Sequence, residues 1–210
     1  MKIKWLGHAS FLIETSGVRI VTDPYSEIGL KFPKVEADIV TVSHDHFDHN
    51  AVNNVGGKFE VVRGVKETTL KGVKFTGVAS YHDEVKGTKR GNNTIFVIEA
   101  EGLKVVHLGD IGHTIDKNLA TKIGGVDVLM VPVGGVYTVD SQGAANIVET
   151  LSPKIVVPMH YKISGLSLSI ADERPFITKF KNVERKKELE VVKANLPSQL
   201  TVVLIEPLRS

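Results

Sequence analysis

Four side chains of the kinds that bind metals lie within six residues of one another after an apolar run. The run ends at Val42, and His44, His46, Asp48 and His49 follow in the pattern His-x-His-x-Asp-His. In an extended segment, residues two apart point to the same side, so His44 and His46 can present two imidazoles to one ion. Once the chain turns, Asp48 and His49 can offer a carboxylate and an imidazole to a neighbouring ion. Desolvating so many polar groups is costly unless they bind something, so the motif predicts a metal site rather than exposed loop histidines.

Three more residues of these kinds follow short apolar runs elsewhere in the chain: His82, Asp110 and His160. Polar residues are common where strands end, so each one alone could be an ordinary hydrogen-bonded loop residue. Strand ends that meet at one edge of a β-sandwich would bring them to the His-x-His-x-Asp-His motif, where the Asp110 carboxylate can bridge two cations. We therefore predict that all three are ligands of a two-metal site.

Composition narrows the chemistry further. The 210 residues include no cysteine, which excludes disulfides, thiolate nucleophiles, iron–sulfur clusters and cysteine-type zinc fingers, so nitrogen and oxygen must hold any metal. The net charge of +2 is too balanced for a dedicated nucleic-acid binder. No apolar run approaches the ~18 residues that cross a bilayer, and the first residues are predicted to form a strand rather than a signal peptide. We expect a cytoplasmic protein with one domain over residues 1–210 and no membrane span.

The elements that must position these residues show an internal repeat. Residues 11–21 and 96–106 are β-rich runs that share Phe, Ile, Glu, Gly and Val at equivalent places, and residues 37–42 resemble residues 126–131. The similar separations favour two copies of one hairpin-plus-strand unit, although β-rich hairpins also resemble one another by chance. Two such halves predict an α/β fold in which two sheets form a sandwich with helices outside.

Helices are predicted at two places. Apolar residues at a helical period predict a helix over residues 141–151, with Asp140 or Ser141 as its N-cap, and a second helix is predicted over residues 171–181. Short β-rich runs predict strands near residues 61–62, 73–78, 155–157, 190–192 and 202–205. Lysines alternate with glutamates over residues 179–193, which we interpret as a solvated face.

Five ordered motifs resemble those of the metallo-β-lactamase-fold hydrolases. They are Thr22-Asp23-Pro24, the run from His44 to His49, His82, Leu108-Gly109-Asp110 and Met159-His160. The resemblance covers nearly the whole chain and implies a four-layer αβ/βα sandwich of two mixed β-sheets, with a dinuclear metal site at its edge. It implies these ligands: His44, His46 and His82 at one metal, Asp48, His49 and His160 at the other, and Asp110 between them. It also implies that Asp23 forms hydrogen bonds behind the ligands.

Within this family, residues 7–11 and 107–113 are most similar to the short stand-alone branch that includes ascorbate-6-phosphate lactonase and the phospholipase D enzymes acting on N-acyl phosphatidylethanolamine. The missing cysteine argues against the single-zinc β-lactamases that use a cysteine ligand. His46, where the di-iron flavoproteins have glutamate, argues against electron transfer. The length leaves no room for the extra domain or long arm of the RNA-processing members.

The expected reaction is hydrolysis. Two divalent ions that share an aspartate can share a water and lower its pKa toward ~7, which produces a bridging hydroxide at neutral pH. Such a site would act on a small ester, lactone or phosphoester. Zinc suits imidazole and carboxylate ligands best, but Mn²⁺ or Fe²⁺ can occupy the same site. Two alternatives stay open: a phosphodiesterase for nucleotides or lipid headgroups, and a metal-binding regulatory module without catalysis.

Several residues around the ligands have open roles. Asp48 is a candidate proton acceptor, and the resemblance places His8 near the metals as a catalytic candidate, a role we also assign to His113. His107 lies within a strand pattern and is expected to be structural. Lys89 and Arg90 belong to a basic loop over residues 85–93, which either binds a phosphate or is simply exposed, and Tyr137 is a further pocket candidate. A homo-oligomer is compatible with the sequence.

Overall fold

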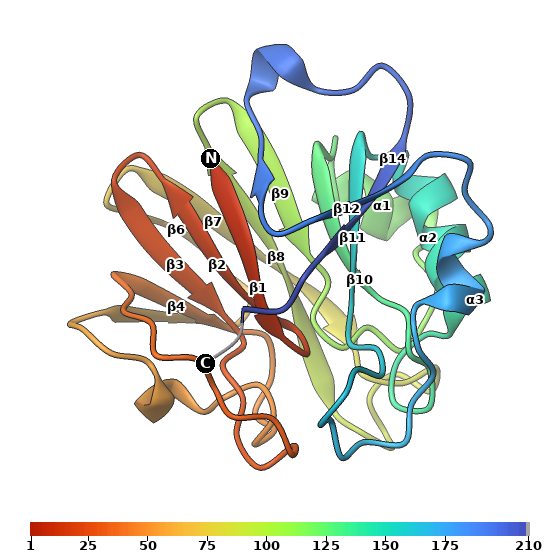
Figure 1. Cartoon of the computed structure of the whole chain (residues 1–210), viewed down its shortest axis with the longest axis horizontal. Helices are drawn as coiled ribbons and strands as arrows, with labels where there is room; N and C mark the ends of the chain where they lie inside the picture. Colours follow the sequence, from red (N-terminus) through yellow and green to blue (C-terminus); the bar gives the residue numbers. More distant parts are fainter. Residues whose placement is uncertain (209–210) are drawn as a thin grey trace.

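Two mixed β-sheets pack face to face, and the main apolar core lies between them (Figure 1). The computed structural model describes residues 1–208. The first sheet has the order β13 (Leu189–Glu190), β1 (Lys2–Gly7), β2 (Ser10–Thr15), β3 (Val18–Thr22), β4 (Ile39–Val42) and β5 (Glu60–Arg63). The second has the order β12 (Val183–Lys186), β14 (Thr201–Ile205), β11 (Ile155–Met159), β10 (Val128–Pro132), β9 (Leu103–His107), β8 (Asn92–Ala100), β7 (Val73–Tyr81) and β6 (Glu67–Leu70).

The internal repeat predicted from the sequence is present in both sheets. In the first sheet β2 pairs antiparallel with β3, and β3 pairs parallel with β4; β8, β9 and β10 repeat this arrangement in the second sheet. One aspartate before the third strand of each unit makes the same contact. The Asp38 carboxylate accepts a hydrogen bond from the backbone N–H of Arg19 at 2.9 Å, and Asp127 accepts one from the N–H of Lys104 at 2.9 Å. The α/β sandwich of two similar halves is therefore confirmed.

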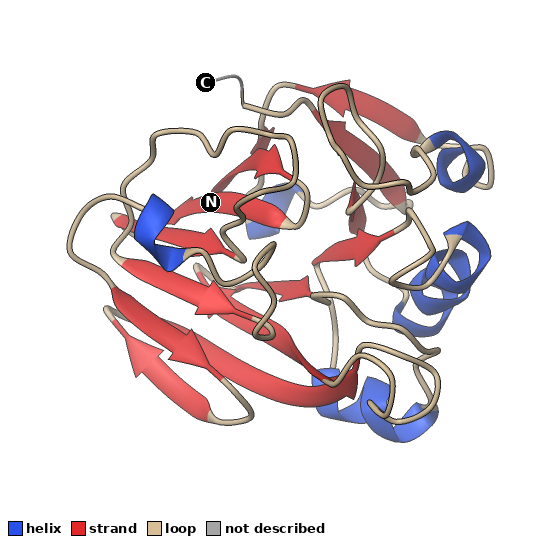
Figure 2. Ribbon diagram, turned by 90° about the horizontal axis from the view of Figure 1, so that it is seen from below, coloured by secondary structure: helices blue, strands red, loops and turns tan. Residues whose placement is uncertain are grey.

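The two outer faces of the sandwich are covered differently. The helices α1 (Lys117–Ile123), α2 (Ser141–Leu151) and α3 (Arg174–Ile177) lie outside the second sheet (Figures 1 and 2). On the outer face of the first sheet, residues such as Leu12 and Val40 pack instead against loop side chains, among them Phe32 and Phe59. The short 3₁₀ helices are η1 (Val52–Asn54), which packs on this face through Val52, and η2 (Lys193–Asn195). The helical layer on this side is thus reduced to loops and one 3₁₀ turn.

The predicted elements near the C-terminal end need correction. The helix over residues 141–151 is confirmed, and Asp140 caps it by accepting hydrogen bonds from two backbone N–H groups. The helix predicted over residues 171–181 is wrong in length, because α3 spans only Arg174–Ile177. The chain leaves the helix early to enter β12, an exposed edge strand that pairs parallel with β14. No helix among residues 1–208 is both long enough and apolar enough to cross a membrane.

Several strands end at one edge of the sandwich, where the predicted ligands follow them. β1 leads into His8, β4 into His44, β7 into His82, β9 into Asp110 and β11 into His160. At two of these corners the backbone bends sharply, since φ is 52° at both His8 and His160. Such left-handed conformations are costly for residues other than glycine and persist where the surrounding structure holds them in place.

Candidate metal centre

A first group of three histidines lies at the end of β4 and β7. Ligand nitrogens of His44, His46 and His82 all lie within 4.8 Å of one another. His44 and His82 are buried and His46 is partly exposed. Because His44 and His46 are two residues apart, their rings approach from the same segment, with centroids separated by 4.6 Å. The structure therefore brings together the three residues that the family resemblance placed at one metal.

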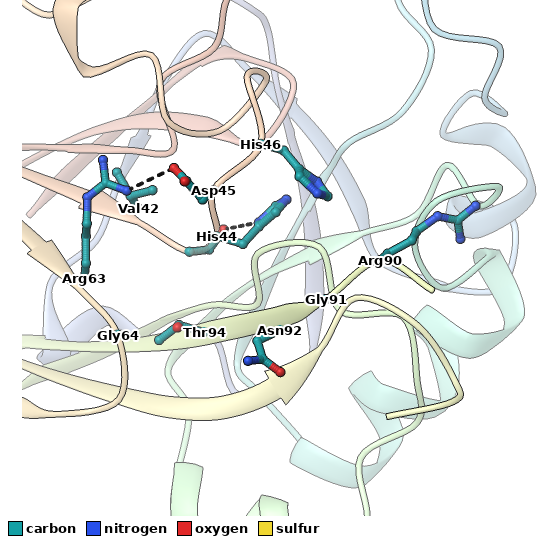
Figure 3. A pocket seen from close by; sticks show the side chains of 11 residues that line it. Val42, His44, Asp45, His46, Arg63, Gly64, Arg90, Gly91, Asn92 and Thr94 are labelled. Carbon is teal, nitrogen blue, oxygen red and sulfur yellow. Dashed lines mark hydrogen bonds and ion pairs between the residues drawn. The ribbon is translucent and has the colours of Figure 1, made fainter. Parts of the chain in front are cut away.

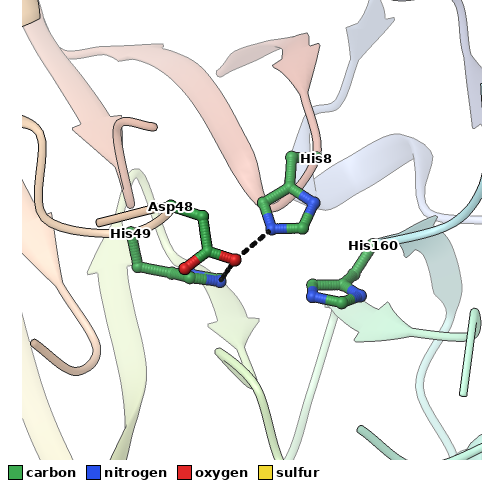
Figure 4. Close-up of side chains that lie close together, drawn as sticks. All are labelled: His8, Asp48, His49 and His160. Atoms are coloured by element: carbon green, nitrogen blue, oxygen red, sulfur yellow. Dashed lines mark hydrogen bonds and ion pairs between the residues drawn. The ribbon is translucent and has the colours of Figure 1, made fainter. Parts of the chain in front are cut away.

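A second group contains His8, Asp48, His49 and His160, whose ligand atoms also lie within 4.8 Å of one another (Figure 4). Three of these residues are those placed at the other metal by the family resemblance. The fourth, His8, is fully buried. The centroids of the His8 and His160 rings are 4.1 Å apart. His8 comes from the first sheet and His160 from the second, so this group joins the two halves of the sandwich.

Asp110 lies between the two groups. Its Oδ2 atom is 3.3 Å from Nε2 of His82 in the first group. The same oxygen is 3.2 Å from Nε2 of His49 and 3.2 Å from Nε2 of His160, both in the second group. One carboxylate that contacts both groups is the arrangement expected of a bridging ligand.

The protonation states in this cluster suit cation binding. Burial and the neighbouring His49 lower the pKa of His44 to about 3, which leaves the neutral imidazole that binds metals. Burial also lowers the pKa of His49, but the Asp110 and Asp23 carboxylates outweigh burial and raise that pKa well above its usual value. Without a cation, a proton on His49 would thus balance the buried carboxylates.

Several buried ligand atoms have no hydrogen-bond partner within residues 1–208. The clearest are Nε2 of His44 and Oδ1 of Asp110. A buried polar atom without a partner is expensive, and a positive ion among these nitrogen and oxygen atoms would satisfy them. The donor set of imidazoles and carboxylates fits a divalent transition metal.

Asp23 orients two of the histidines from behind. Its carboxylate lies 2.9 Å from Nδ1 of His49 and accepts hydrogen bonds from the backbone N–H and the hydroxyl of Ser43. The Ser43 hydroxyl in turn contacts Nδ1 of His44 at 2.9 Å. Because these contacts occupy both Nδ1 atoms, Nε2 of each ring faces the cluster.

The Asp110 backbone is held by side chains from neighbouring strands. The side-chain oxygen of Asn93 accepts a hydrogen bond from the Asp110 N–H at 3.0 Å, and the Asn93 amide donates to the Leu108 carbonyl at 2.9 Å. His107 accepts from the Gly109 N–H at 3.1 Å. These contacts support the structural role that the sequence predicts for His107. Nothing in the sequence around Asn93 indicates its role, because the residue sits in an ordinary strand pattern.

The two remaining catalytic candidates differ in position. Nε2 of His8 lies 3.2 Å from Oδ2 of Asp48, and burial together with His160 lowers the pKa of His8 to about 4. His113 belongs to neither ligand group. Its Nε2 accepts a hydrogen bond from the Tyr81 N–H at 3.1 Å, and its Nδ1 lies 2.7 Å from the Thr114 carbonyl. The structure thus brings His8, and not His113, into the cluster.

Two pockets open beside His46. One, of about 360 Å³, has ligand residues on its floor, and its walls are formed by Phe47, Lys89, Arg90, Tyr137 and Leu168. The other, of about 410 Å³, lies beside His44, with Arg63 on its far wall (Figure 3). Arg90, like His46, lines both pockets.

The cluster and its fold match a known superfamily. A model of the β-lactamase superfamily domain matches residues 2–160, which include every member of both ligand groups. The chain belongs to the β-lactamase superfamily.

Relatives within this superfamily support the same assignment. A UPF0173 metal-dependent hydrolase of Thermococcus kodakarensis is 32% identical in an alignment that covers 77% of this chain and 84% of that protein. A Thermotoga maritima structure, described as a Zn-dependent hydrolase of the metallo-β-lactamase superfamily, is 38% identical, has a TM-score of 0.83 and covers 99% of both chains. Igni18, a metallo hydrolase of Ignicoccus hospitalis, shares the fold with a TM-score of 0.66 at 24% identity, covering 98% of this chain and 95% of its own. This superfamily member is a metal-dependent hydrolase.

Proposed function

We propose that the chain is a dinuclear metal-dependent hydrolase acting on a small ester, lactone or phosphoester. His44, His46 and His82 would hold one ion, Asp48, His49 and His160 the other, and Asp110 would bridge them. The observation that carries the proposal is the contact of one Asp110 oxygen, within 3.3 Å, with histidines of both groups. When bound, two divalent ions supply an activated water for attack and polarise the substrate oxygen.

The protein's own residues would handle the proton and the substrate. Asp48 lies at the edge of the cluster, and its carboxylate is 3.2 Å from Nε2 of His8. The hydrogen bond with His8 lowers the pKa of Asp48 although burial opposes it, so the carboxylate stays ionised; its role as proton acceptor is proposed from its position beside the cluster. His8, neutral near pH 7, would hold that carboxylate in place and relay the proton. Phe47 and Tyr137 border the pocket above these groups and would exclude water from one side of the substrate.

The finer assignments belong to this proposal as well. Zinc is the ion we propose, because imidazole and carboxylate ligands suit it best, and Mn²⁺ or Fe²⁺ would fit the same ligands. A phosphodiesterase for nucleotides or lipid headgroups uses the same ligand set and is a second outcome of the test. A cytoplasmic location, one domain over residues 1–210 and a homo-oligomeric state stay predictions.

Metal analysis beside activity assays tests the proposal. Purified wild type, His46→Ala and Asp110→Ala should be analysed for metals and assayed on a lactone, a thioester and a phosphodiester, with Asp45→Asn as the control. Asp45 lies within the same motif, but 84% of its side chain is exposed and it belongs to neither ligand group. We expect about two ions per chain in wild type and in the control, and a loss of metal and of turnover in the other two variants. Fewer than about one ion per chain after reconstitution would refute the ligand assignment, whereas full metal content without any turnover would favour the regulatory module.

A further inference from the structure

The loop over residues 84–91 is organised by one buried carboxylate next to the metal centre. Asp83 is 3% exposed and accepts four hydrogen bonds from backbone N–H groups of this loop. Oδ1 accepts from Val85 at 2.9 Å and from Gly87 at 2.8 Å. Oδ2 accepts from Lys89 at 2.9 Å and from Arg90 at 2.8 Å. The carboxylate therefore fixes the backbone from which the side chains of Lys89 and Arg90 extend.

These two cations line the pocket above the ligand residues. Neither Lys89 nor Arg90 forms an ion pair with any residue of the described chain 1–208. The Asp83 carboxylate, which lies beside this loop, is occupied by the loop backbone. The Arg90 guanidinium instead lies over the ring of Tyr137, 5.3 Å from its centroid. An arginine stacked on an aromatic ring keeps its in-plane N–H groups available to an acceptor.

The rest of the pocket rim is apolar. Phe47 is 53% exposed and Tyr137 is 36% exposed, although both are large apolar side chains beside the metal ligands. Leu168 completes this side of the pocket. Exposed apolar groups that gather at a pocket mouth indicate a ligand with an apolar part.

We propose that Arg90, assisted by Lys89, binds a carboxylate or phosphate group of the substrate, while Phe47 and Tyr137 contact an apolar part of the same molecule. This inference rests on the proposed function and narrows its substrate class to esters that carry a negative charge away from the bond being broken. Arginine suits this task because its planar donors match the two oxygens of a carboxylate or phosphate.

A binding experiment tests the subsite without requiring turnover. Benzoate, phenylphosphonate and neutral benzamide are titrated by calorimetry into the protein as purified, into Arg90→Gln and into Lys86→Asn. Lys86 is the matched control, because it belongs to the same loop and carries the same charge but does not line the pocket. Asparagine tolerates the left-handed φ of 57° found at this position.

We expect Arg90→Gln to weaken the binding of at least one of the two anions by roughly tenfold or more, as for the loss of a charged hydrogen bond, and Lys86→Asn to change it less than about twofold. If Arg90→Gln weakens the binding of benzoate alone, the subsite binds carboxylates. If it weakens the binding of phenylphosphonate alone, the subsite binds phosphates. Equal affinity of wild type and Arg90→Gln for both anions, or binding of benzamide as tight as that of the anions, would overturn the inference.

Paired esters separate this inference from the proposed function. 4-Nitrophenyl acetate and mono-4-nitrophenyl succinate share a leaving group, and the succinate ester carries an additional carboxymethyl group with its negative charge. We expect Arg90→Gln to lower kcat/KM for the succinate ester by roughly tenfold and to leave the acetate ester within about twofold. If wild type hydrolyses both esters and Arg90→Gln changes kcat/KM by the same factor for each, that result would support the proposed hydrolase and contradict the anion subsite. If wild type holds no metal and hydrolyses neither ester, the proposed function fails, while the calorimetry still decides whether Arg90 binds the anion.

Discussion

At the scale of single residues, the cluster depends on side chains that lie behind the proposed ligands. Asp23 is the clearest example, because its carboxylate contacts Nδ1 of His49 and both donors of Ser43. If the charge of Asp23 is removed, the proposed ligands are still present, but the rings of His49 and His44 are no longer held in one orientation. Such outer partners of metal ligands are typically worth 10–100-fold in metal affinity.

We therefore predict that Asp23→Asn lowers metal affinity by roughly 10–100-fold while the protein stays folded. Asparagine cannot accept hydrogen bonds through both side-chain atoms, so either Ser43 or His49 loses its partner. Affinity is measured by competition with a chromogenic chelator, and circular dichroism reports the fold. Asp45→Asn serves as the control, since Asp45 is exposed. Unchanged metal affinity in Asp23→Asn would show that the hydrogen bonds of Asp23 are not needed to orient the histidines.

His113 provides a contrasting prediction. Both of its ring nitrogens contact backbone groups, those of Tyr81 and Thr114, so the side chain holds one turn against a strand. We predict that His113→Ala lowers the free energy of unfolding by about 1 kcal/mol, the usual worth of a hydrogen bond, and leaves kcat within about twofold. Urea denaturation and steady-state assays measure the two effects. A large loss of kcat in a stable variant would restore the catalytic role expected from the sequence.

Local spacing predicted part of the site, and tertiary contacts determine the rest. His44, His46 and His49 could be grouped from sequence because one short segment carries them. The hydrogen bonds of Asn93 and Asp83 were not foreseeable, because each depends on how a neighbouring loop folds back. His113 lies near a motif in sequence, but its ring contacts backbone groups instead of the cluster, so its catalytic role stays a prediction.

At the scale of elements, the two halves repeat strands more faithfully than they repeat helices. β3 and β9 have the same place in their hairpins, which the shared apolar pattern predicted. α1 was not predicted, because only Ile123 is fully buried in this short helix and its pattern is weak. β12 was not predicted either, because all four of its residues are exposed and it pairs through the backbone alone.

Asp38 gives an element-scale prediction that depends on pH. Hydrogen bonds from the Arg19 backbone and from Lys71 hold the pKa of Asp38 below its usual value. Because the folded pKa lies below the unfolded value of 3.8, the carboxylate contributes stability above about pH 4, and this contribution is lost as the pH falls below that value. We predict that Asp38→Asn lowers the free energy of unfolding by about 1 kcal/mol at pH 7, and that the difference from wild type narrows below pH ~4.

Urea denaturation at several pH values measures this difference between wild type and Asp38→Asn. Glu36→Gln is the control, because Glu36 also contacts Arg19 but its side chain is 64% exposed. An exposed ion pair of this kind should contribute less than about 0.5 kcal/mol. If the difference in the free energy of unfolding between wild type and Asp38→Asn stays constant from pH 7 to pH 3, the charge of Asp38 does not contribute to stability.

At the scale of the whole molecule, the candidate metal centre closes the sandwich along one edge. His8, His44 and Asp48 belong to the first sheet and its loops, whereas His82, Asp110 and His160 follow strands of the second. A cation held by both sets would bind the folded state and not the unfolded chain, so its binding free energy adds to the stability of the fold. Without it, the edge contains buried nitrogen and oxygen atoms that lack partners. The same groups that define the site therefore weaken the fold when no ion satisfies them.

This coupling predicts a large effect of metal removal on thermal stability. At a free metal concentration of about a thousand times Kd, each bound ion adds roughly 4 kcal/mol, and for a chain of this size each kcal/mol shifts Tm by about 2–4 °C, so even one ion accounts for a shift of about 10 °C. We expect a chelator to lower the Tm of the metal-loaded protein by about 10 °C and added metal to restore it, as measured by calorimetry. Asp110→Ala should show little dependence on the chelator, because the shared ligand that contacts both groups is gone. If the Tm of metal-loaded wild type does not respond to the chelator, the ions do not hold the two sheets together and the sandwich is stabilised by its apolar core alone.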